Sequence, residues 1–171
     1  MKSIKLQKVS LLFFIALFIW YSLVFFNIPK LLIAGSINLF SLSSLLELFL
    51  VIILLGYFLK WKYTDFFALF ILFLWGYLQY AAQWRHLLFK PSKEVLNHYY
   101  QFFHGTLRFF PQSDVRIVPD AYHTILGLLI LLNLIMVIYK IILFLKNRNR
   151  KNVLESNKQN GWKSKKGGMR K

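Results

Sequence analysis

Residues 124–145 read TILGLLILLNLIMVIYKIILFL, and this stretch decides the fold class. It is apolar almost throughout, with a polar amide at Asn133 and a single charge at Lys140. A helix of roughly 20 residues crosses the ~30 Å hydrocarbon core of a bilayer. Because lipid offers no hydrogen-bonding partners, the backbone of such a segment must satisfy its own polar groups by forming a helix. The stretch therefore predicts a membrane-spanning helix.

Three further apolar stretches precede it, at about residues 9–28, 42–59 and 66–84. Hydrophobic residues make up 57% of the 171 residues and the mean hydropathy is +0.50, whereas soluble domains contain about 45–50% apolar residues. We predict an all-α integral membrane protein with a four-helix transmembrane bundle over residues 1–145. Residues 30–41 are too short to span, so they either form a re-entrant segment or lengthen the second helix.

The first apolar stretch could also belong to a cleaved signal peptide, because Lys2, Lys5 and Lys8 precede it. It is longer than the apolar region of a typical signal peptide, about 7–15 residues, and no small residues at cleavage-site spacing follow it closely. We therefore expect an uncleaved first helix. The chain contains no cysteine, which excludes disulfides, thiolate metal ligands and thiol catalysis.

The net charge of +16 is concentrated near the ends of the chain. Residues 146–171 are densely basic around a single acid, Glu155, and Lys60 and Lys62 follow the second apolar stretch. Since Lys and Arg flank spans on the cytoplasmic side, we expect both termini in the cytoplasm. A bacterial cytoplasmic membrane is expected, with the endoplasmic reticulum as the alternative. The basic tail is expected to be disordered and to contact anionic lipid, and nucleic acid is the less favoured partner.

The connection over residues 85–123 holds all four histidines and would lie outside the membrane on the far side from the termini. An amphipathic helix is expected at about residues 92–110, with Ser92 as its N-cap and Pro111 as its stop. Such a helix would cap the mouth of the bundle with its aromatic face turned down. Its apolar stripe consists of Leu96, Tyr100, Phe103, Leu107 and Phe110.

Polar residues gather near the outer ends of the predicted helices. Because polar groups are costly in hydrocarbon, each of these residues is expected to have a structural or functional role. Glu47 would lie about 7 Å below the outer boundary, at a rise of 1.5 Å per residue. Gln79, Gln83 and His86 are spaced to share one face of the third helix. In the structural interpretation, which we favour, these groups hydrogen-bond between helices, and Asp120 caps the fourth helix.

In the functional interpretation, a carboxylate and a histidine transfer protons on a lipid-like substrate, while Arg108 and Arg116 hold its anionic headgroup. A zinc site is a weaker alternative, because no two histidines have the HxxxH or HxH spacing, and we expect neither a metal ion nor a cofactor. The catalytic candidates are Glu47, His86, Asp120 and His123, and the other binding candidates are Gln79, Gln83, His98 and His104.

The sequence has no phosphate-binding glycine loop, nucleophile elbow or HExxH motif. Our leading expectation is a non-catalytic accessory or assembly subunit of a membrane complex, bound to a membrane-protein partner or to copies of itself. One alternative is a membrane enzyme that acts on a lipid or polyprenyl substrate at the outer leaflet and requires Glu47 with at least one histidine. The other alternative is an oligomeric transporter or channel subunit. The only residue that supports it is Asn133, which would lie in the middle of the membrane.

Overall fold

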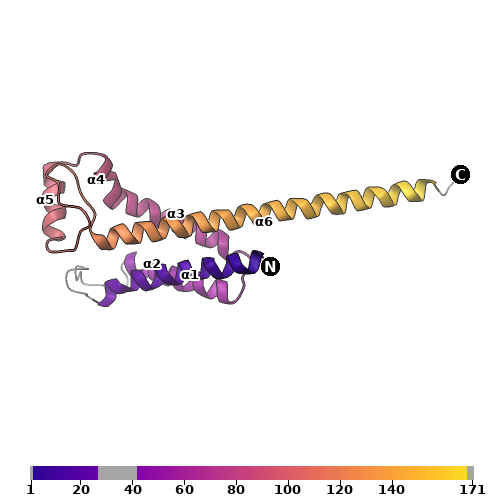
Figure 1. The fold of residues 1–171 in the computed structure, drawn as a ribbon, viewed down its shortest axis with the longest axis horizontal. Helices are drawn as coiled ribbons and strands as arrows, with labels where there is room; N and C mark the ends of the chain where they lie inside the picture. Colours follow the sequence, from indigo (N-terminus) through magenta and orange to yellow (C-terminus); the bar gives the residue numbers. More distant parts are fainter. Residues whose placement is uncertain (1, 27–41, 169–171) are drawn as a thin grey trace. The chain divides into compact units, whose positions relative to one another are not determined.

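The computed structural model describes residues 2–26 and 42–168, and all regular secondary structure in these ranges is helical (Figure 1). The all-α class expected from the sequence is thereby confirmed. The segment over residues 30–41 lies outside the described residues. The elements are α1 (Lys2–Ser22), η1 (Leu23–Phe26), α2 (Leu42–Phe58), α3 (Thr64–Gln79), the π-helical η2 (Tyr80–Trp84), α4 (Arg85–Leu88), α5 (Lys93–Phe102) and α6 (Ala121–Gly168).

Two helices are long and apolar enough to cross a membrane. One is the continuous run Thr64–Leu88 through α3, η2 and α4, and the other is Ala121–Arg150 within α6. Only 22% and 17% of their apolar windows are buried within the molecule, whereas the core helix of a soluble protein is mostly buried. The apolar parts of α1 and α2, Leu6–Ser22 and Ser44–Phe58, are shorter, so the expected set of four spans is not confirmed.

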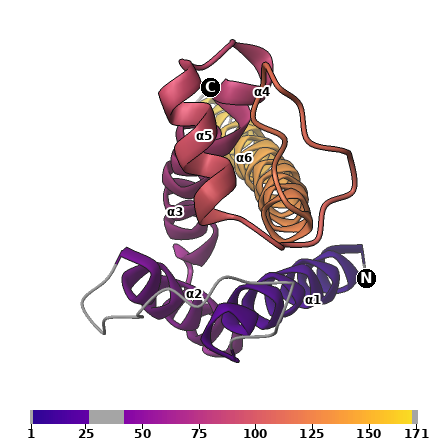
Figure 2. The same ribbon diagram turned by 90° about the vertical axis from the view of Figure 1, so that its left-hand side faces the viewer.

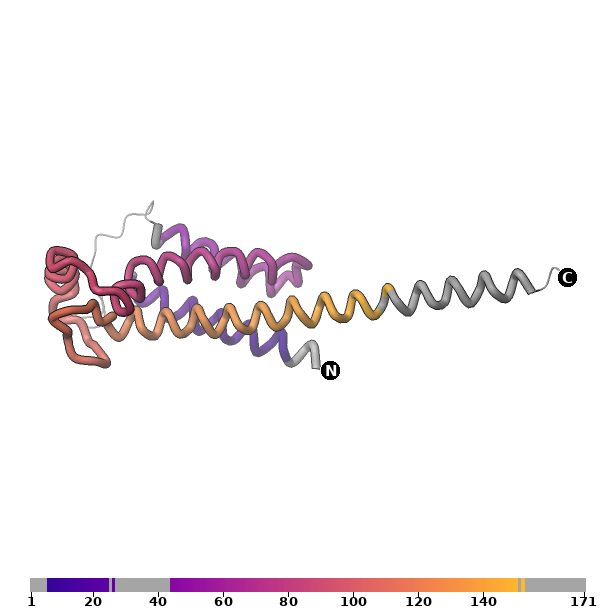
Figure 3. Tube along the Cα trace, turned by 90° about the horizontal axis from the view of Figure 1, so that it is seen from above, coloured from indigo at the N-terminus to yellow at the C-terminus, as the bar shows by residue number. Residues whose placement is uncertain are grey.

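The chain divides into two compact units, residues 1–137 and residues 138–171. In the first unit α1 packs on α2 and α2 packs on α3, and Figure 3 shows these helices running alongside the first part of α6. Close packing of apolar side chains holds such helices together in water and in lipid. The largest side chains of this core that are almost fully buried include Phe14, Leu17, Leu50, Ile53, Ile71, Leu72, Trp75, Leu126 and Val137.

Hydrogen bonds also attach the first part of α6 to α1. The Asn133 side-chain amide donates to the Phe13 carbonyl at 3.1 Å and to the Leu129 carbonyl of its own helix at 2.9 Å. The Trp20 indole N–H donates to the Tyr122 carbonyl at 3.2 Å. Because a buried donor without a partner is costly, these bonds fix the register between the two helices.

In the second unit α6 continues to Gly168, although the basic composition predicts disorder from residue 146 onward. Residues 146–160 contain neither glycine nor proline. Lys and Arg, which make up five of these fifteen residues, rank among the better helix formers, whereas Asn, which makes up another five, ranks lower. The helical path of α6 therefore continues past its apolar part into the basic tail.

A tight turn joins α2 to α3. Lys60 adopts a left-handed conformation with a φ of 55°, and the Trp61 N–H donates to the Gly56 carbonyl at 2.9 Å. The turn brings the first residue of α3 against α2, because a Cβ placed on Gly56 would lie 2.7 Å from the Thr64 hydroxyl oxygen. A residue without a side chain is therefore required at position 56.

Both predicted helix starts in the outer connection are confirmed. The Ser92 hydroxyl accepts a hydrogen bond from the Val95 N–H at 3.3 Å at the start of α5. The Asp120 carboxylate accepts from the His123 N–H at 2.8 Å at the start of α6. The first N–H groups of a helix have no intrahelical acceptor, so each cap stabilises its helix by about 1 kcal/mol. Figure 2 shows α5 and the loop that follows it lying near the start of α6.

The end of α5 corrects the prediction of a helix over about residues 92–110. α5 ends at Phe102 with Phe103 as its C-cap, and Gly105 in the turn that follows adopts a left-handed conformation with a φ of 78°. The Phe103 carbonyl, which has no intrahelical donor, accepts hydrogen bonds from the Arg108 guanidinium and from the Thr106 hydroxyl, both at 2.9 Å. The chain beyond α5 is a loop, so the predicted apolar stripe is interrupted. Its last two members, Leu107 and Phe110, are exposed.

We expect Gly56→Ala to lower the free energy of unfolding by about 1–3 kcal/mol, because the new Cβ overpacks against Thr64. Thr64 is buried and β-branched, so it has little freedom to change rotamer. The measurement is thermal unfolding of the full chain in detergent, followed by circular dichroism. In a Thr64→Ala background the same substitution should cost less. An equal cost in both backgrounds would show that this contact is not the cause.

Candidate functional site

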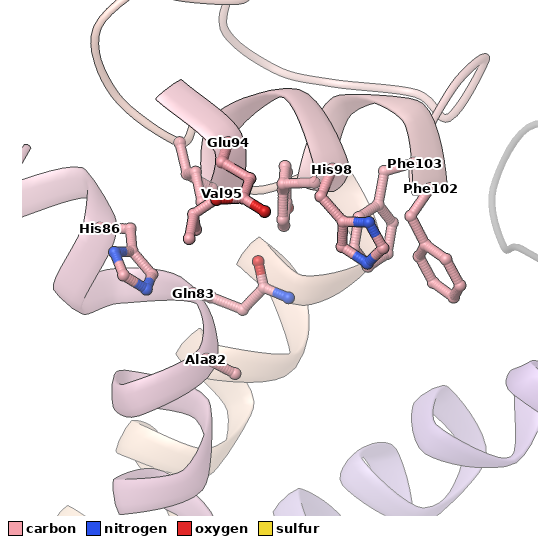
Figure 4. Close-up of a pocket in the computed structure, with 10 residues that line it drawn as sticks. Ala82, Gln83, His86, Glu94, Val95, His98, Phe102 and Phe103 are labelled. Atoms are coloured by element: carbon pink, nitrogen blue, oxygen red, sulfur yellow. The ribbon is translucent and has the colours of Figure 1, made fainter. Parts of the chain in front are cut away.

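A pocket of about 660 Å³ lies between α5 and the π-helical turn η2 (Figure 4). Its volume falls within the range of small-molecule sites, about 300–1,000 Å³. Its polar lining consists of Gln83, His86, Glu94, His98 and Tyr99. Its apolar lining consists of Ala82, Val95, Phe102, Phe103 and Ile117.

One wall of this pocket is a single face of α5. Glu94, His98 and Phe102 follow one another at intervals of four residues, which places them in one row along a helix. In Figure 4 the Glu94 carboxylate and the His98 imidazole extend from α5 into the space that faces η2. The wall thus combines a carboxylate, an imidazole and an aromatic ring.

The opposite wall depends on the π-helical turn. The Arg85 N–H donates to the Tyr80 carbonyl five residues earlier, so this turn contains one residue more than an α-helical turn. The side chains after the turn therefore point in other directions around the helix axis than a regular α-helix would give them. Gln83 and His86 come to line the pocket beneath α5. Gln79 lies before the turn and lines a different, apolar pocket of about 630 Å³ between α3, η2 and the first part of α6. Gln79 therefore lines a different pocket from the other two residues, with which the spacing predicts a shared face.

Two polar groups in the lining are buried without a partner. Gln83 is 6% exposed and Tyr99 is 7% exposed. The Gln83 carbonyl oxygen and the Tyr99 hydroxyl have no hydrogen-bond partner among the described residues. A buried polar atom in this state costs about 1–3 kcal/mol. Burial also raises the pKa of the Tyr99 hydroxyl, so this group is protonated and able to donate at neutral pH.

The histidine at the α4 end of the pocket touches a cation. The Arg85 guanidinium lies 3.4 Å from the His86 Nε2 atom, and this contact is a hydrogen bond when that nitrogen is the unprotonated acceptor. Glu94, by contrast, has no Lys or Arg within ion-pairing distance in the described part of the chain. The two ends of the pocket therefore differ in charge.

Asp120 and His123 form a separate pair at the start of α6. The Asp120 carboxylate is almost fully buried, 2.8 Å from the His123 Nδ1 atom and 2.8 Å from the His123 backbone nitrogen. The His123 ring packs edge-on against Phe103, with 5.3 Å between ring centroids. The structure thus brings together two of the predicted catalytic residues, in an arrangement that caps a helix.

Glu47 is hydrogen-bonded at the junction of α1 and α2. Its carboxylate accepts a hydrogen bond from the Ser22 hydroxyl at 2.8 Å, which joins the end of α1 to α2. Glu47 does not line the pocket beneath α5. Glu47 and His86, both predicted catalytic residues, therefore do not line this pocket together.

The remaining predicted binding residues also lie outside the pocket. The Arg108 guanidinium donates to a backbone carbonyl and lies 5.0 Å from the Tyr100 ring centroid. Arg116 is exposed, and its backbone carbonyl accepts a hydrogen bond from the Tyr100 hydroxyl at 2.9 Å. His104 is exposed in the loop after α5. Of the predicted binding residues, only Gln83 and His98 line the pocket.

The described residues contain no group of three or more His, Asp or Glu side chains placed to hold a metal ion. His86, Glu94 and His98 line the same pocket but do not form such a group. A zinc site needs at least three protein ligands around one point. The arrangement in this part of the chain therefore suits the binding of an organic ligand better than that of a metal ion.

Glu94 and Tyr99 are pocket residues that the predicted site does not include. Glu94 could have been predicted from the sequence, because it lies four residues before His98 and eight before Phe102, on the same face of a helix. Ile117 could not have been predicted from helix spacing, because it lies in the loop after α5. Its N–H donates to the His86 carbonyl at 3.3 Å, which holds it at the pocket.

A comparison with known protein families finds no match for this chain, and comparisons with curated proteins and with solved structures find none either.

Asp120→Ala is expected to lower the free energy of unfolding by about 1–2 kcal/mol, because α6 loses its N-cap. Asp120→Asn should have a much smaller effect, since asparagine caps helices about as well as aspartate. Thermal unfolding of both variants in detergent measures this difference. A loss from Asp120→Asn as large as that from Asp120→Ala would show that the charge, and not the cap, is what the fold requires.

Proposed function

We propose that the protein is a non-catalytic accessory or assembly subunit of a membrane complex. The observation that carries this proposal is that the two expected catalytic acids, Glu47 and Asp120, both make contacts within the fold. Glu47 is hydrogen-bonded to Ser22, and Asp120 is buried at the start of α6. A catalytic acid or base has to reach a proton on its substrate. Neither carboxylate lines the pocket beneath α5, which is consistent with structural roles for both.

In the proposed arrangement four apolar helical segments cross the bilayer. They are the apolar parts of α1 and α2, the run through α3 to α4, and the first part of α6. The lengths and hydropathies of Thr64–Leu88 and Ala121–Arg150 support the last two. The basic ends favour cytoplasmic termini in a bacterial cytoplasmic membrane, with α5 and its loop outside and the basic tail against anionic lipid.

Exposed apolar side chains on the outer connection support a protein partner on that side. Five of them fall within residues 102–115 and are between 49% and 65% exposed. Aromatic side chains are enriched in protein interfaces, where they fill pockets on the partner. We therefore place the partner surface here. Its residues are Phe102, Leu107, Phe109, Phe110 and Val115.

The test is purification of the tagged full chain from native membranes in mild detergent, with quantification of every co-purifying protein. We expect a membrane protein near one-to-one stoichiometry. Phe109→Ser combined with Phe110→Ser should lower its recovery by at least about tenfold, as for central residues of an interface. Gln112→Ser is the matched control, because it changes an exposed polar residue of the same loop and should leave recovery unchanged.

Two outcomes would contradict the accessory role. A chain that purifies alone from native membranes has no stable partner there. If, in addition, Glu47→Gln abolishes the function of the protein in cells while the variant remains folded, the membrane enzyme becomes the better account. That alternative draws its support from His86 and His98, which line one open pocket.

A further inference from the structure

The pocket beneath α5 presents hydrogen-bond acceptors to a ligand and no permanent cation. None of the described residues that line it is Lys or Arg. Its polar lining instead includes the Glu94 carboxylate, the Gln83 amide and the His98 imidazole. An anionic group placed here would meet a carboxylate without a compensating charge, which is unfavourable. A group that donates hydrogen bonds or carries a positive charge fits this lining better.

Gln83 indicates that the pocket is built to take a polar group. Its side chain is more than nine-tenths buried, and its carbonyl oxygen has no partner among the described residues. In Figure 4 the amide extends into the space between η2 and α5, toward His98. The π-helical turn places it there at the cost of an unsatisfied acceptor. A donor on a bound molecule would remove that cost.

Aromatic rings form a corner at the same end of the pocket. The ring centroids of Tyr99 and Phe103 are 4.5 Å apart, and those of Phe102 and Phe103 are 5.0 Å apart with an interplanar angle of 75°. Rings at such an angle turn their faces in different directions. The negative face of an aromatic ring attracts an ammonium group within about 6 Å of its centroid.

The two ends of the pocket differ in charge, and this difference favours one end for a positively charged group. Arg85 touches His86 at the α4 end, so a second cation is disfavoured there. Glu94 and His98 lie one helical turn apart at the α5 end, and Glu94 has no basic partner within ion-pairing distance among the described residues. The carboxylate is therefore available to a positively charged ligand at the end where Phe102 lies.

We propose that this pocket binds the ammonium group of an organic cation that also has an apolar part. The Glu94 carboxylate balances the charge, the Gln83 carbonyl oxygen and the aromatic corner surround the ammonium group, and Val95 and Ile117 contact the apolar part. The proposal rests on the pocket and not on the accessory role, and Phe102 is the one residue that the pocket shares with the partner surface.

The experiment is isothermal titration of the full chain in dodecyl maltoside micelles at neutral pH with benzylammonium, whose N–H groups can donate to the Gln83 carbonyl oxygen, corrected by titration into empty micelles. Benzyl alcohol is the neutral probe, and phenylmethanesulfonate is the anionic probe. We expect the cation to bind at least about tenfold more tightly than either, as for a cation held by a carboxylate and aromatic rings.

Glu94→Gln should weaken binding of the cation by about fivefold, and Phe102→Leu, which keeps an apolar side chain but removes the ring, by about threefold. Both residues are exposed on α5, so the fold should survive, and circular dichroism checks this. Asp114→Asn is the matched control, because it removes a negative charge from the same connection outside the pocket. It should change affinity less than about twofold.

Four results would overturn the proposal. They are the absence of saturable binding, equal binding of benzyl alcohol, tighter binding of the sulfonate, and equal losses from Glu94→Gln and Asp114→Asn. The last result would mean that the cation responds to the general surface charge. None of these results depends on whether a partner protein co-purifies, so this proposal and the accessory role can fail separately.

Discussion

Polar side chains within apolar helices are costly unless they are hydrogen-bonded, and three of those in the first unit of this protein bond from one helix to another. Asn133 donates to a backbone carbonyl of α1. The Tyr57 hydroxyl donates to Asp65 at 2.7 Å across the α2–α3 turn, and Glu47 accepts from the end of α1. The polar residues that stand out most in the apolar sequence thus join helix to helix. Their positions set how the apolar faces pack.

The π-helical turn η2 has the largest consequence for the site. It separates the apolar pocket between α3 and α6, which Gln79 lines, from the polar pocket beneath α5, which Gln83 lines. Trp84 turns toward α6, where its indole nitrogen lies 3.0 Å from the point that a Cβ on Gly127 would occupy. Such turns are frequent at functional sites because they redirect side chains within an otherwise regular helix. Here the redirected side chain is a buried glutamine with an unsatisfied oxygen.

The sequence predicts those features that depend on neighbouring residues. The helical class and the caps at Ser92 and Asp120 are confirmed, because apolar runs and capping residues act locally. The π-helical turn is not predictable from a pattern that assumes 3.6 residues per turn, so the sequence does not show that Gln79 and Gln83 line different pockets. The early end of α5 is not marked by the predicted apolar stripe, which continues through Leu107 and Phe110. The pocket itself requires the tertiary fold.

In the proposed arrangement the apolar helices cross a membrane, and α5 lies on the side opposite to the basic tail. Because the chain has no cysteine, each introduced cysteine is unique, and a membrane-impermeant maleimide on intact cells tests the claim directly. His104→Cys, in the exposed loop after α5, should be labelled in intact cells. Lys158→Cys, in the basic tail, should be labelled only after the membrane is permeabilised. Labelling of both positions in intact cells, or of position 158 alone, would contradict this arrangement.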